Sequence, residues 1–203
     1  MTDIYKETPI WRADFTSKNI EELKDFETRL NRLFKLECKI RACTSNKFGK
    51  TFNLGINCAP IARILLLCGV PAGQKVITKF SIPGWIKNDK EFFREFCKRM
   101  FTCEGSIMYE KNRKFPQIRL SMWKWEGLFK EGLVFIEDIC KYLDKYFNIK
   151  TAISFSKSRN IRKDGLITRP ITIYIVAENS VKFYNEIGFG NWKQQTLKAI
   201  LSR

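Results

Sequence analysis

The chain has 203 residues, with 37 Lys and Arg against 21 Asp and Glu, a formal net charge of +16, and 44% hydrophobic and 14% aromatic residues. This length allows one large domain or two small ones with a real core, and the aromatic content excludes the disordered class because enough apolar surface is present to offset ordering entropy. The longest apolar runs are far short of the roughly 20 residues that cross a bilayer, and the N-terminus has no signal-peptide apolar region. We therefore expect a soluble intracellular protein, cytoplasmic and nucleoid-associated, with no membrane partner.

Histidine and cysteine usage limits the chemistry. The chain has no histidine and seven cysteines, and no two cysteines are spaced as C-x-x-C. Structural zinc and a disulfide framework are therefore not expected. The absence of histidine also excludes Ser-His-Asp and Cys-His catalysis and any imidazole base. A hydrolytic reaction would need carboxylates, lysines or a metal, and we expect no organic cofactor.

The order of predicted elements repeats along the chain. Apolar spacing predicts an amphipathic helix over 19–34, with Asn19 as its N-cap and Glu22 three positions on, and a second helix over roughly 133–147. Two predicted strands follow each helix, at 39–43 and 51–56 in the first half and at about 150–156 and 171–177 in the second. We interpret this order as an internal duplication in an α+β protein.

Apolar and polar residues alternate along three stretches, 11–16, 117–122 and 171–175. Because successive side chains of a strand point to opposite faces, the apolar side would pack on the helices and the polar side would face solvent. The polar side carries Arg, Gln, Ser, Thr, Tyr and Asn, which can hydrogen-bond base edges. An ordinary half-solvated antiparallel sheet gives the same alternation.

A basic segment lies between the last two predicted strands. Residues 156–170 hold five basic residues and one acidic residue, a net charge of +4, which favours phosphate contacts over a merely solvated loop when the whole chain carries +16. We expect double-stranded DNA as the partner, with RNA as the alternative. The expected contact residues are Arg12, Thr16, Arg41, Lys47, Lys50, Asn53, Gln117, Arg119, Ser121, Ser154, Lys157, Arg159, Arg162, Lys163, Arg169, Thr172 and Tyr174.

A third amphipathic helix is predicted over 88–104, with Asn88 as N-cap, Glu91 at N3 and Gly105 ending it. Its apolar stripe, which we expect to face other protein, consists of Phe92, Phe93, Phe96, Cys97, Met100 and Phe101. Glu104 lies at the C-terminal end, where the helix dipole disfavours a carboxylate. A bound divalent cation such as Mg²⁺ would remove that penalty; a solvated glutamate is the alternative.

The nonamer CKRMFTCEG at 97–105 resembles the LAGLIDADG motif of homing endonucleases, with Glu104 at the second acidic position and Gly105 at the final glycine. The flanking stretches resemble archaeal and intein-type members of that family, from about Pro9 to the C-terminus. These stretches are LCGVPAGQKVITKFSIPGWI, RKDGLITRPITIYI and FYNEIGFGNWKQQTL.

The resemblance implies an α+β fold in which mixed or antiparallel sheets, with helices behind them, form a saddle over DNA. In that family two motif helices pack together, and their acidic residues hold divalent metals for the hydrolysis of both strands. Carried over to this chain, Glu104 would be the catalytic metal ligand for Mg²⁺ or Mn²⁺. Lys193 and Gln194 match polar positions close to the active site, so they are catalytic candidates.

The chain departs from the motif in three places, because Lys98 replaces a small or basic residue, Arg99 the usual glycine and Thr102 the first acidic residue. We interpret 1–80 as a partial first repeat without a motif helix, and 81–203 as a repeat with the motif helix at 88–104. One hypothesis is an endonuclease that obtains its second motif by homodimerising or by pairing with a separate fragment. The other is a degenerate relative that binds nucleic acid as a maturase or regulator without cutting.

Overall fold

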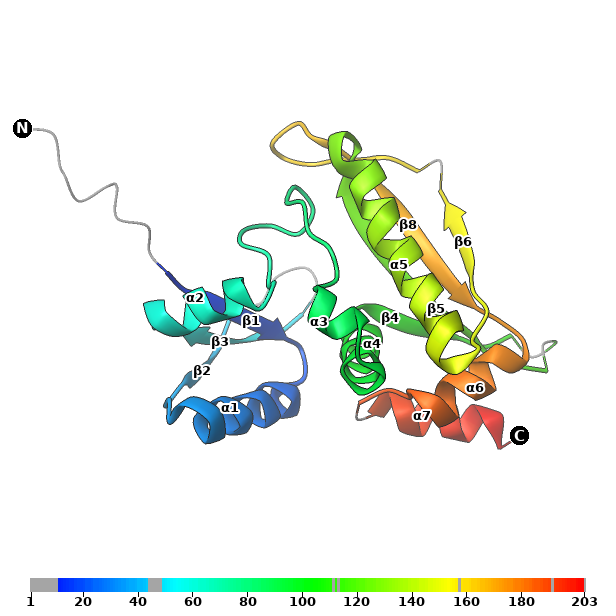
Figure 1. Cartoon of the computed structure of the whole chain (residues 1–203), viewed down its shortest axis with the longest axis horizontal. Helices are drawn as coiled ribbons and strands as arrows, with labels where there is room; N and C mark the ends of the chain where they lie inside the picture. The colour runs from blue at the N-terminus through cyan, green and yellow to red at the C-terminus, as the bar shows by residue number, and fades with distance from the viewer. Residues whose placement is uncertain are drawn as a thin grey trace, which may run out of the picture. The chain divides into compact units, whose positions relative to one another are not determined.

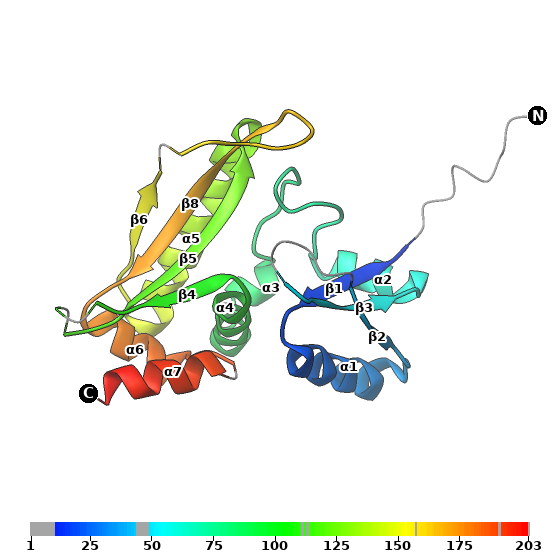
Figure 2. The ribbon, with the colours of Figure 1, turned by 180° about the vertical axis from the view of Figure 1, so that it is seen from behind.

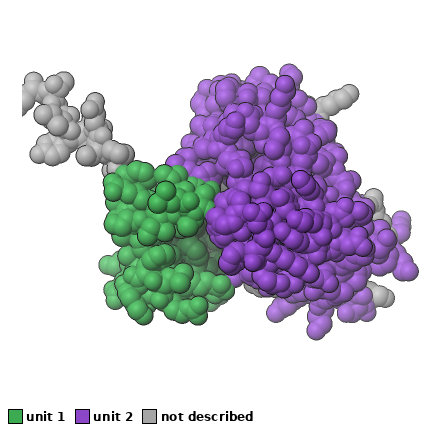
Figure 3. Space-filling model, in the orientation of Figure 1, with its two compact units in different colours: residues 1–70 green, residues 71–203 purple. Residues whose placement is uncertain are grey.

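The computed structural model describes residues 11–43, 49–110, 112, 114–156, 158–190 and 192–202. These residues form two compact units, 1–70 and 71–203, coloured separately in Figure 3. The units divide ten residues before the repeat boundary expected from the sequence, and the assignment of the two repeats stays a prediction. Lys47 and Lys157 of the expected interface lie outside the described residues.

The first unit is a small three-stranded antiparallel sheet, ordered β1-β3-β2, with two helices. Its elements are β1 (Ala13–Ser17), α1 (Ile20–Phe34), β2 (Lys39–Ala42), β3 (Phe52–Ile56) and α2 (Ala59–Leu67). The predicted cap of α1 is confirmed, since the Asn19 side chain accepts the backbone N–H of Glu21 at 3.1 Å. Five buried residues form the core of this unit: Leu23, Leu30, Leu54, Ile56 and Ile61.

The second unit is built on the sheet order β4-β5-β8-β6, with β7 paired to β8 and all pairs antiparallel. Its helices are α3 (Gly84–Lys87), α4 (Lys90–Glu104), α5 (Phe129–Phe147), α6 (Glu178–Glu186) and α7 (Trp192–Leu201). Its strands are β4 (Gly105–Met108), β5 (Gln117–Trp125), β6 (Ala152–Phe155), β7 (Asn160–Ile161) and β8 (Ile167–Ile175). A short 3₁₀ turn, Glu126–Leu128, joins β5 to α5.

Helices cover one face of this sheet. In Figure 1 α5 crosses in front of β5 and β8, and in Figure 2 the same strands lie in front of α5. The buried face carries Ile118 and Leu120 of β5, and α4 adds Phe93, Cys97 and Phe101 to the same core. The predicted α+β class with antiparallel sheets and helices behind them is confirmed.

The two units repeat one connectivity. The first unit runs β1, α1, β2, β3, α2. The second runs β5, α5, β6, β8, α6, with the two-residue strand β7 added between β6 and β8, and β3 and β8 are the central strands of the two modules. In the second unit, α4 and β4 precede this module, and β4 pairs with the outer edge of β5. Among the described residues, β1 pairs only with β3, so the α4–β4 part has no counterpart in the first unit.

Several predicted boundaries are wrong. Asp89 rather than Asn88 caps α4, because Asn88 ends the preceding short helix α3 while the Asp89 carboxylate accepts the N–H of Glu91 at 2.8 Å. The second helix begins at Phe129, four residues before the expected start. Strand β8 begins at Ile167, so Arg169 lies in a strand and not in the basic loop. None of the described helices is long and apolar enough to span a bilayer.

Candidate nucleic-acid interface and acidic site

The uncovered face of the larger sheet gathers most of the residues expected there. The strand register places Ser121, Thr172 and Ser154 in one row across β5, β8 and β6, and Arg119 beside Tyr174 in the next row. The hydroxyls of Ser121 and Thr172 lie 2.8 Å apart. Thr172 is only 8% exposed, because it sits in the central strand, so the expectation that it faces solvent is wrong for this residue. Gln117 lies at the start of β5, opposite Met108.

The smaller sheet repeats this arrangement. Thr16, Asn53 and Arg41 form one row across β1, β3 and β2, and the Asn53 amide donates to the Thr16 hydroxyl at 3.2 Å. Arg12, which lies just before β1, is held by Asp14 of that strand, with Nη2 and Oδ1 2.7 Å apart. Lys50 lies just before β3, with its ammonium 5.6 Å from the centre of the Phe52 ring.

The arginines of the basic segment, residues 156–170, form ion pairs or ring contacts with other residues of the second unit. Arg162 pairs with Asp164 at 2.8 Å, and the hydrogen bond between them raises the pKa of the guanidinium and lowers the pKa of the carboxyl group. Arg159 pairs with Glu126 at 3.1 Å. The register opposes Arg169 to Lys124 on the helix-covered face, where its guanidinium stacks 4.7 Å from the Phe129 ring centre. Arg169 is therefore misplaced in the predicted interface, whereas Lys163 is exposed in the loop.

Glu104 is the last residue of α4, and its side chain is 44% exposed. Its carboxylate pairs with the ammonium of Lys75, which comes from the irregular segment before α3. The geometry agrees with the predicted position of Glu104 at the helix end. Lys75 is not among the site residues expected from the sequence, although it lies inside one of the stretches that resemble the family.

Lys193 approaches the same helix end from α7. Its ammonium donates to the carbonyl of Gly105 at 2.9 Å and to the carbonyl of Thr102. These carbonyls lie at the end of α4, where a cation is favoured by the helix dipole. The predicted closeness of Lys193 to the end of the motif helix therefore agrees with the structure, and its catalytic role stays a prediction.

Thr102 occupies the motif position usually held by an acidic residue. Its buried side chain bonds both to α4 and to the turn before α7, an arrangement that we call the Thr102 clamp. Its hydroxyl donates to the carbonyl of Lys98 at 2.6 Å and accepts the N–H of Gly190 at 2.7 Å. Gln194 of α7 bonds to the turn that precedes its helix, where its side-chain carbonyl accepts the N–H of Phe189 at 2.8 Å. The structure thus gives Gln194 a structural partner in the turn before α7.

Replacing Thr102 by Val is expected to lower the free energy of unfolding by about 1 kcal/mol, because the partly buried N–H of Gly190 then loses its acceptor. Chemical denaturation of the two proteins measures the difference. Thr28→Val is the matched control, since Thr28 makes the same bond to a helix carbonyl on an exposed surface of α1. An equal effect in both variants would contradict the clamp.

The apolar stripe of α4 faces the core of its own unit. Phe93, Cys97 and Phe101 are fully buried, whereas Phe92 is 54% exposed and stacks edge-on against Trp85 at 5.4 Å. The exposed member of the stripe is therefore Phe92, which together with Trp85 of α3 is left for contact with another protein. Burial raises the pKa of the Cys97 thiol well above its usual range.

The donor groups at the end of α4 are oxygen atoms, the type that a hard divalent cation binds. They are fewer than the ligands that such a cation needs. Glu104 supplies one carboxylate, and backbone carbonyls supply neutral oxygens. No cluster of three or more Asp, Glu, Cys or His that could hold a metal occurs in the described part of the chain. Water, a DNA phosphate or the Glu104 carboxylate of a second copy would have to complete such a site.

No family model matches the chain. The chain is 29% identical over 154 residues to a replication factor C small subunit of Methanocaldococcus jannaschii. It is 30% identical over 123 residues to a tRNA-splicing ligase RtcB of Methanopyrus kandleri. These alignments cover 75% and 60% of the chain, but only 8% and 12% of the relatives. The likeness is therefore to a small segment of two differently named proteins.

Solved structures match over most of the chain. The homing endonuclease I-WcaI bound to its DNA recognition sequence superposes with a TM-score of 0.54, covering 95% of this chain and 77% of that one at 15% identity. I-DmoI in complex with DNA and calcium gives a TM-score of 0.55, covering 93% and 83% at 13% identity. The chain has the homing endonuclease fold. At this identity the likeness shows the fold alone.

Proposed function

We propose that the protein binds double-stranded DNA through the polar faces of its two sheets and hydrolyses phosphodiester bonds at Glu104 with a divalent metal. One combination of features carries this proposal. The chain has the fold of homing endonucleases, and it places a half-exposed carboxylate, Glu104, at the end of α4, where the ammonium groups of Lys75 and Lys193 also lie. The neighbouring endonucleases are described with DNA, and one I-DmoI structure with manganese. The strand rows and the net charge of +16 support a DNA partner.

Each group at this site has a part in the proposed reaction. A bound Mg²⁺ or Mn²⁺ would activate water and polarise the phosphate. Glu104 would supply its charged ligand, and Lys193 would hold the carbonyls around Glu104 in place. Since each chain supplies one Glu104, cutting both strands requires two copies or a partner fragment. We propose pairing through the exposed side chains of Trp85 in α3 and Phe92 in α4.

Cleavage of a pool of random-sequence duplex DNA with Mg²⁺ or Mn²⁺, with a chelator control, tests the reaction. The expected result is metal-dependent cutting of both strands. The second candidate function, a nucleic-acid binder that does not cut, is favoured by the pairing of the single carboxylate with Lys75. Binding without cutting by any divalent metal would select it.

DNA affinity is expected to fall steeply with salt. An interface that neutralises about six phosphates gives a slope near −5 for log K against log salt. Replacing Arg159, Arg162 and Lys163 by alanine should reduce that slope by about 2 to 3, at about 0.9 per contact. Fluorescence anisotropy measures it, with alanine at Lys24 and Lys150 as control, because these two lysines are also ion-paired but lie outside the expected contact residues. A flat parent slope would contradict DNA binding.

A further inference from the structure

The helix after the central strand, α2 in the first unit and α6 in the second, ends in the same way in both units. The N–H of Cys68 donates to the carbonyl of Ile64 at 2.9 Å, and the N–H of Ile187 donates to the carbonyl of Phe183 at 3.0 Å. A glycine with positive φ follows each time, at residues 69 and 188. Both helices are nine residues long. Ile64 of α2 therefore corresponds to Phe183 of α6.

These two corresponding residues differ in burial. Phe183 is fully buried, with the ring of Phe101 of α4 centred 4.8 Å away and the ring of Phe189 centred 5.3 Å away. Ile64 is 43% exposed. The surface that α4 covers on α6 is thus open on α2 in the described part of the first unit.

The end of α2 is apolar where the end of α6 is polar. The same correspondence sets Leu66 and Leu67 against Asn185 and Glu186, and all four side chains are exposed. Leu67, at 87%, is the most exposed large apolar side chain among the residues described. Solvent favours the polar residues that α6 has here, whereas adjoining exposed apolar side chains mark a contact with another protein. This end of α2 therefore has the composition of a contact surface.

The two sheets differ in a matching way at one edge. In the second unit β4 pairs with β5 along residues 117–120. Ala13 pairs with Ile56 as Ile118 pairs with Ile175, so residues 12–15 of the first unit correspond to 117–120. Among the described residues β1 pairs only with β3. Its other edge presents backbone groups that an added strand would satisfy.

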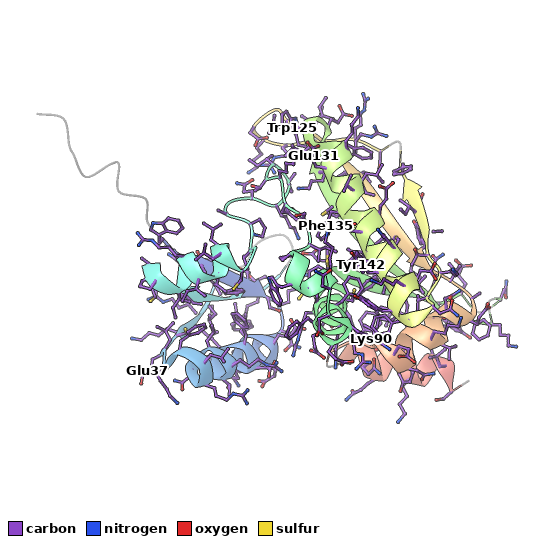
Figure 4. All side chains as sticks on the ribbon, in the orientation of Figure 1. Glu37, Lys90, Trp125, Glu131, Phe135 and Tyr142 are labelled. Atoms are coloured by element: carbon purple, nitrogen blue, oxygen red, sulfur yellow. The ribbon has the colours of Figure 1, made fainter. Side chains whose placement is uncertain are left out.

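The chain's own α4–β4 segment is already used in the second unit. Phe93, Cys97 and Phe101 of α4 are fully buried there, and the Phe93 ring centre lies 5.5 Å from that of Tyr142 in α5. Figure 4 labels Tyr142 and Lys90, the first residue of α4. A second copy would supply its α4–β4 segment to the first unit only by opening its own core. The open surface therefore fits a segment of another polypeptide.

We propose that the first unit binds a helix–strand segment of a different polypeptide, with the helix packed on α2 and the strand paired with β1. We call Ile64, Leu66 and Leu67 together with the open edge of residues 12–15 the docking surface. The inference goes beyond the proposed function, because it rests on the repeated connectivity and on neither DNA binding nor cutting.

The second unit indicates the chemistry of this partner segment. Phe101 covers Phe183, and Gly105 begins β4 one helical turn later. The partner helix should likewise present a large apolar side chain to Ile64, followed one turn later by a short strand antiparallel to β1. Arg63 is the only charged residue of α2 and is exposed. A carboxylate at the rim of the partner helix would complement its charge.

A synthetic peptide of residues 88–108, which carries the sequence of α4 and β4, is the probe for the docking surface. The peptide is labelled with a fluorophore and titrated with the full chain under reducing conditions. We expect a saturable rise in fluorescence anisotropy. The double variant Ile64→Gln, Leu67→Gln should weaken the affinity by about tenfold or more, because two aliphatic side chains lose their burial in the complex.

The double variant Leu33→Gln, Val134→Gln is the matched control. Leu33 of α1 and Val134 of α5 are 67% and 56% exposed, so the same chemical change is made on helix surfaces outside the docking surface. This control should bind the peptide as the parent does. No saturable binding by the parent, or equal losses in the two double variants, would overturn the proposal.

Hydrogen exchange locates the bound peptide and does not depend on any variant. Amides of α2, and those of residues 12–15 that do not bond to β3, should exchange more slowly in the complex. Amides of β6, an edge strand of the other sheet, should be unchanged. Slowing in the second unit alone would overturn the docking surface.

Sedimentation of the chain without peptide tests a second copy as the occupant. The Ile64→Gln, Leu67→Gln variant is expected to sediment as the parent does. A parent dimer that this variant dissociates would show that a second copy covers α2, and would overturn the assignment to a different polypeptide. A parent that binds no DNA but binds the peptide at α2 and β1 would contradict the proposed function and support this inference.

Discussion

Glu104→Gln is expected to abolish metal-dependent DNA cutting, with a loss of rate of several orders of magnitude. The substitution keeps the size of the side chain and removes the only carboxylate at the end of α4 among the residues described there. Without that charge a divalent cation loses its one anionic protein ligand. DNA affinity should stay the same or rise slightly, because a negative charge that repels phosphate is gone.

Glu95→Gln is the matched control for this substitution. Glu95 lies on the same helix, is half-exposed and pairs with Lys98 at 4.0 Å, so it loses a comparable charge away from the helix end. Its cutting rate should equal that of the parent. Stability should change little for Glu104→Gln, since an exposed ion pair contributes about 0–1 kcal/mol and the helix dipole disfavours the carboxylate. Parent-like cutting by Glu104→Gln would show that the catalytic assignment is wrong.

The repeated connectivity explains why one carboxylate is found. The modules beginning with β1 and with β5 share the same order of elements, and only the second is preceded by a described α4–β4 pair. Glu104 belongs to that pair and not to the shared module. A second metal-binding carboxylate of this kind would therefore come from outside the described residues or from a second copy.

Strand alternation and helix periodicity are local properties, and for this reason much of the fold could be predicted. Ile118 and Leu120 had to lie on one face because side chains alternate, and the structure buries both. Asn19 could be recognised as a cap because its partner lies two residues away. Glu104 was placed at a helix end because Gly105 follows it.

Contacts between distant segments could not be predicted in the same way. Lys75 and Glu104 are 29 residues apart, and only the folding of the irregular segment before α3 brings them together. Lys124 did leave a signal, since it continues the buried parity of 118, 120 and 122 and is the only charged residue in that series. Arg169 was misplaced because β8 begins at Ile167 and so includes it, on the face that Ile171 also occupies, and strand ends are poorly marked by composition.

Gly105→Ala is expected to have the largest effect on stability among these substitutions, about 1–3 kcal/mol, as for other overpacked sites. A Cβ at residue 105 would lie 2.4 Å from the carbonyl oxygen of Phe101, the same oxygen that accepts the Gly105 N–H. The backbone must therefore shift where α4 passes into β4. The shift would also move the Gly105 carbonyl away from Lys193 and displace Glu104, so cutting should fall together with stability.

Gly84→Ala is the control for this last substitution. Gly84 is the first residue of α3, and a Cβ there would meet no atom within 4 Å. Its replacement should leave the free energy of unfolding unchanged or raise it by about 0.4–1 kcal/mol, because alanine reduces the entropy of the unfolded chain. Thermal and denaturant unfolding of the two variants measures the contrast. Because the two glycines differ in the space around them, equal stabilities would mean that the junction of α4 and β4 is looser than these distances require, and that it does not fix the position of Glu104.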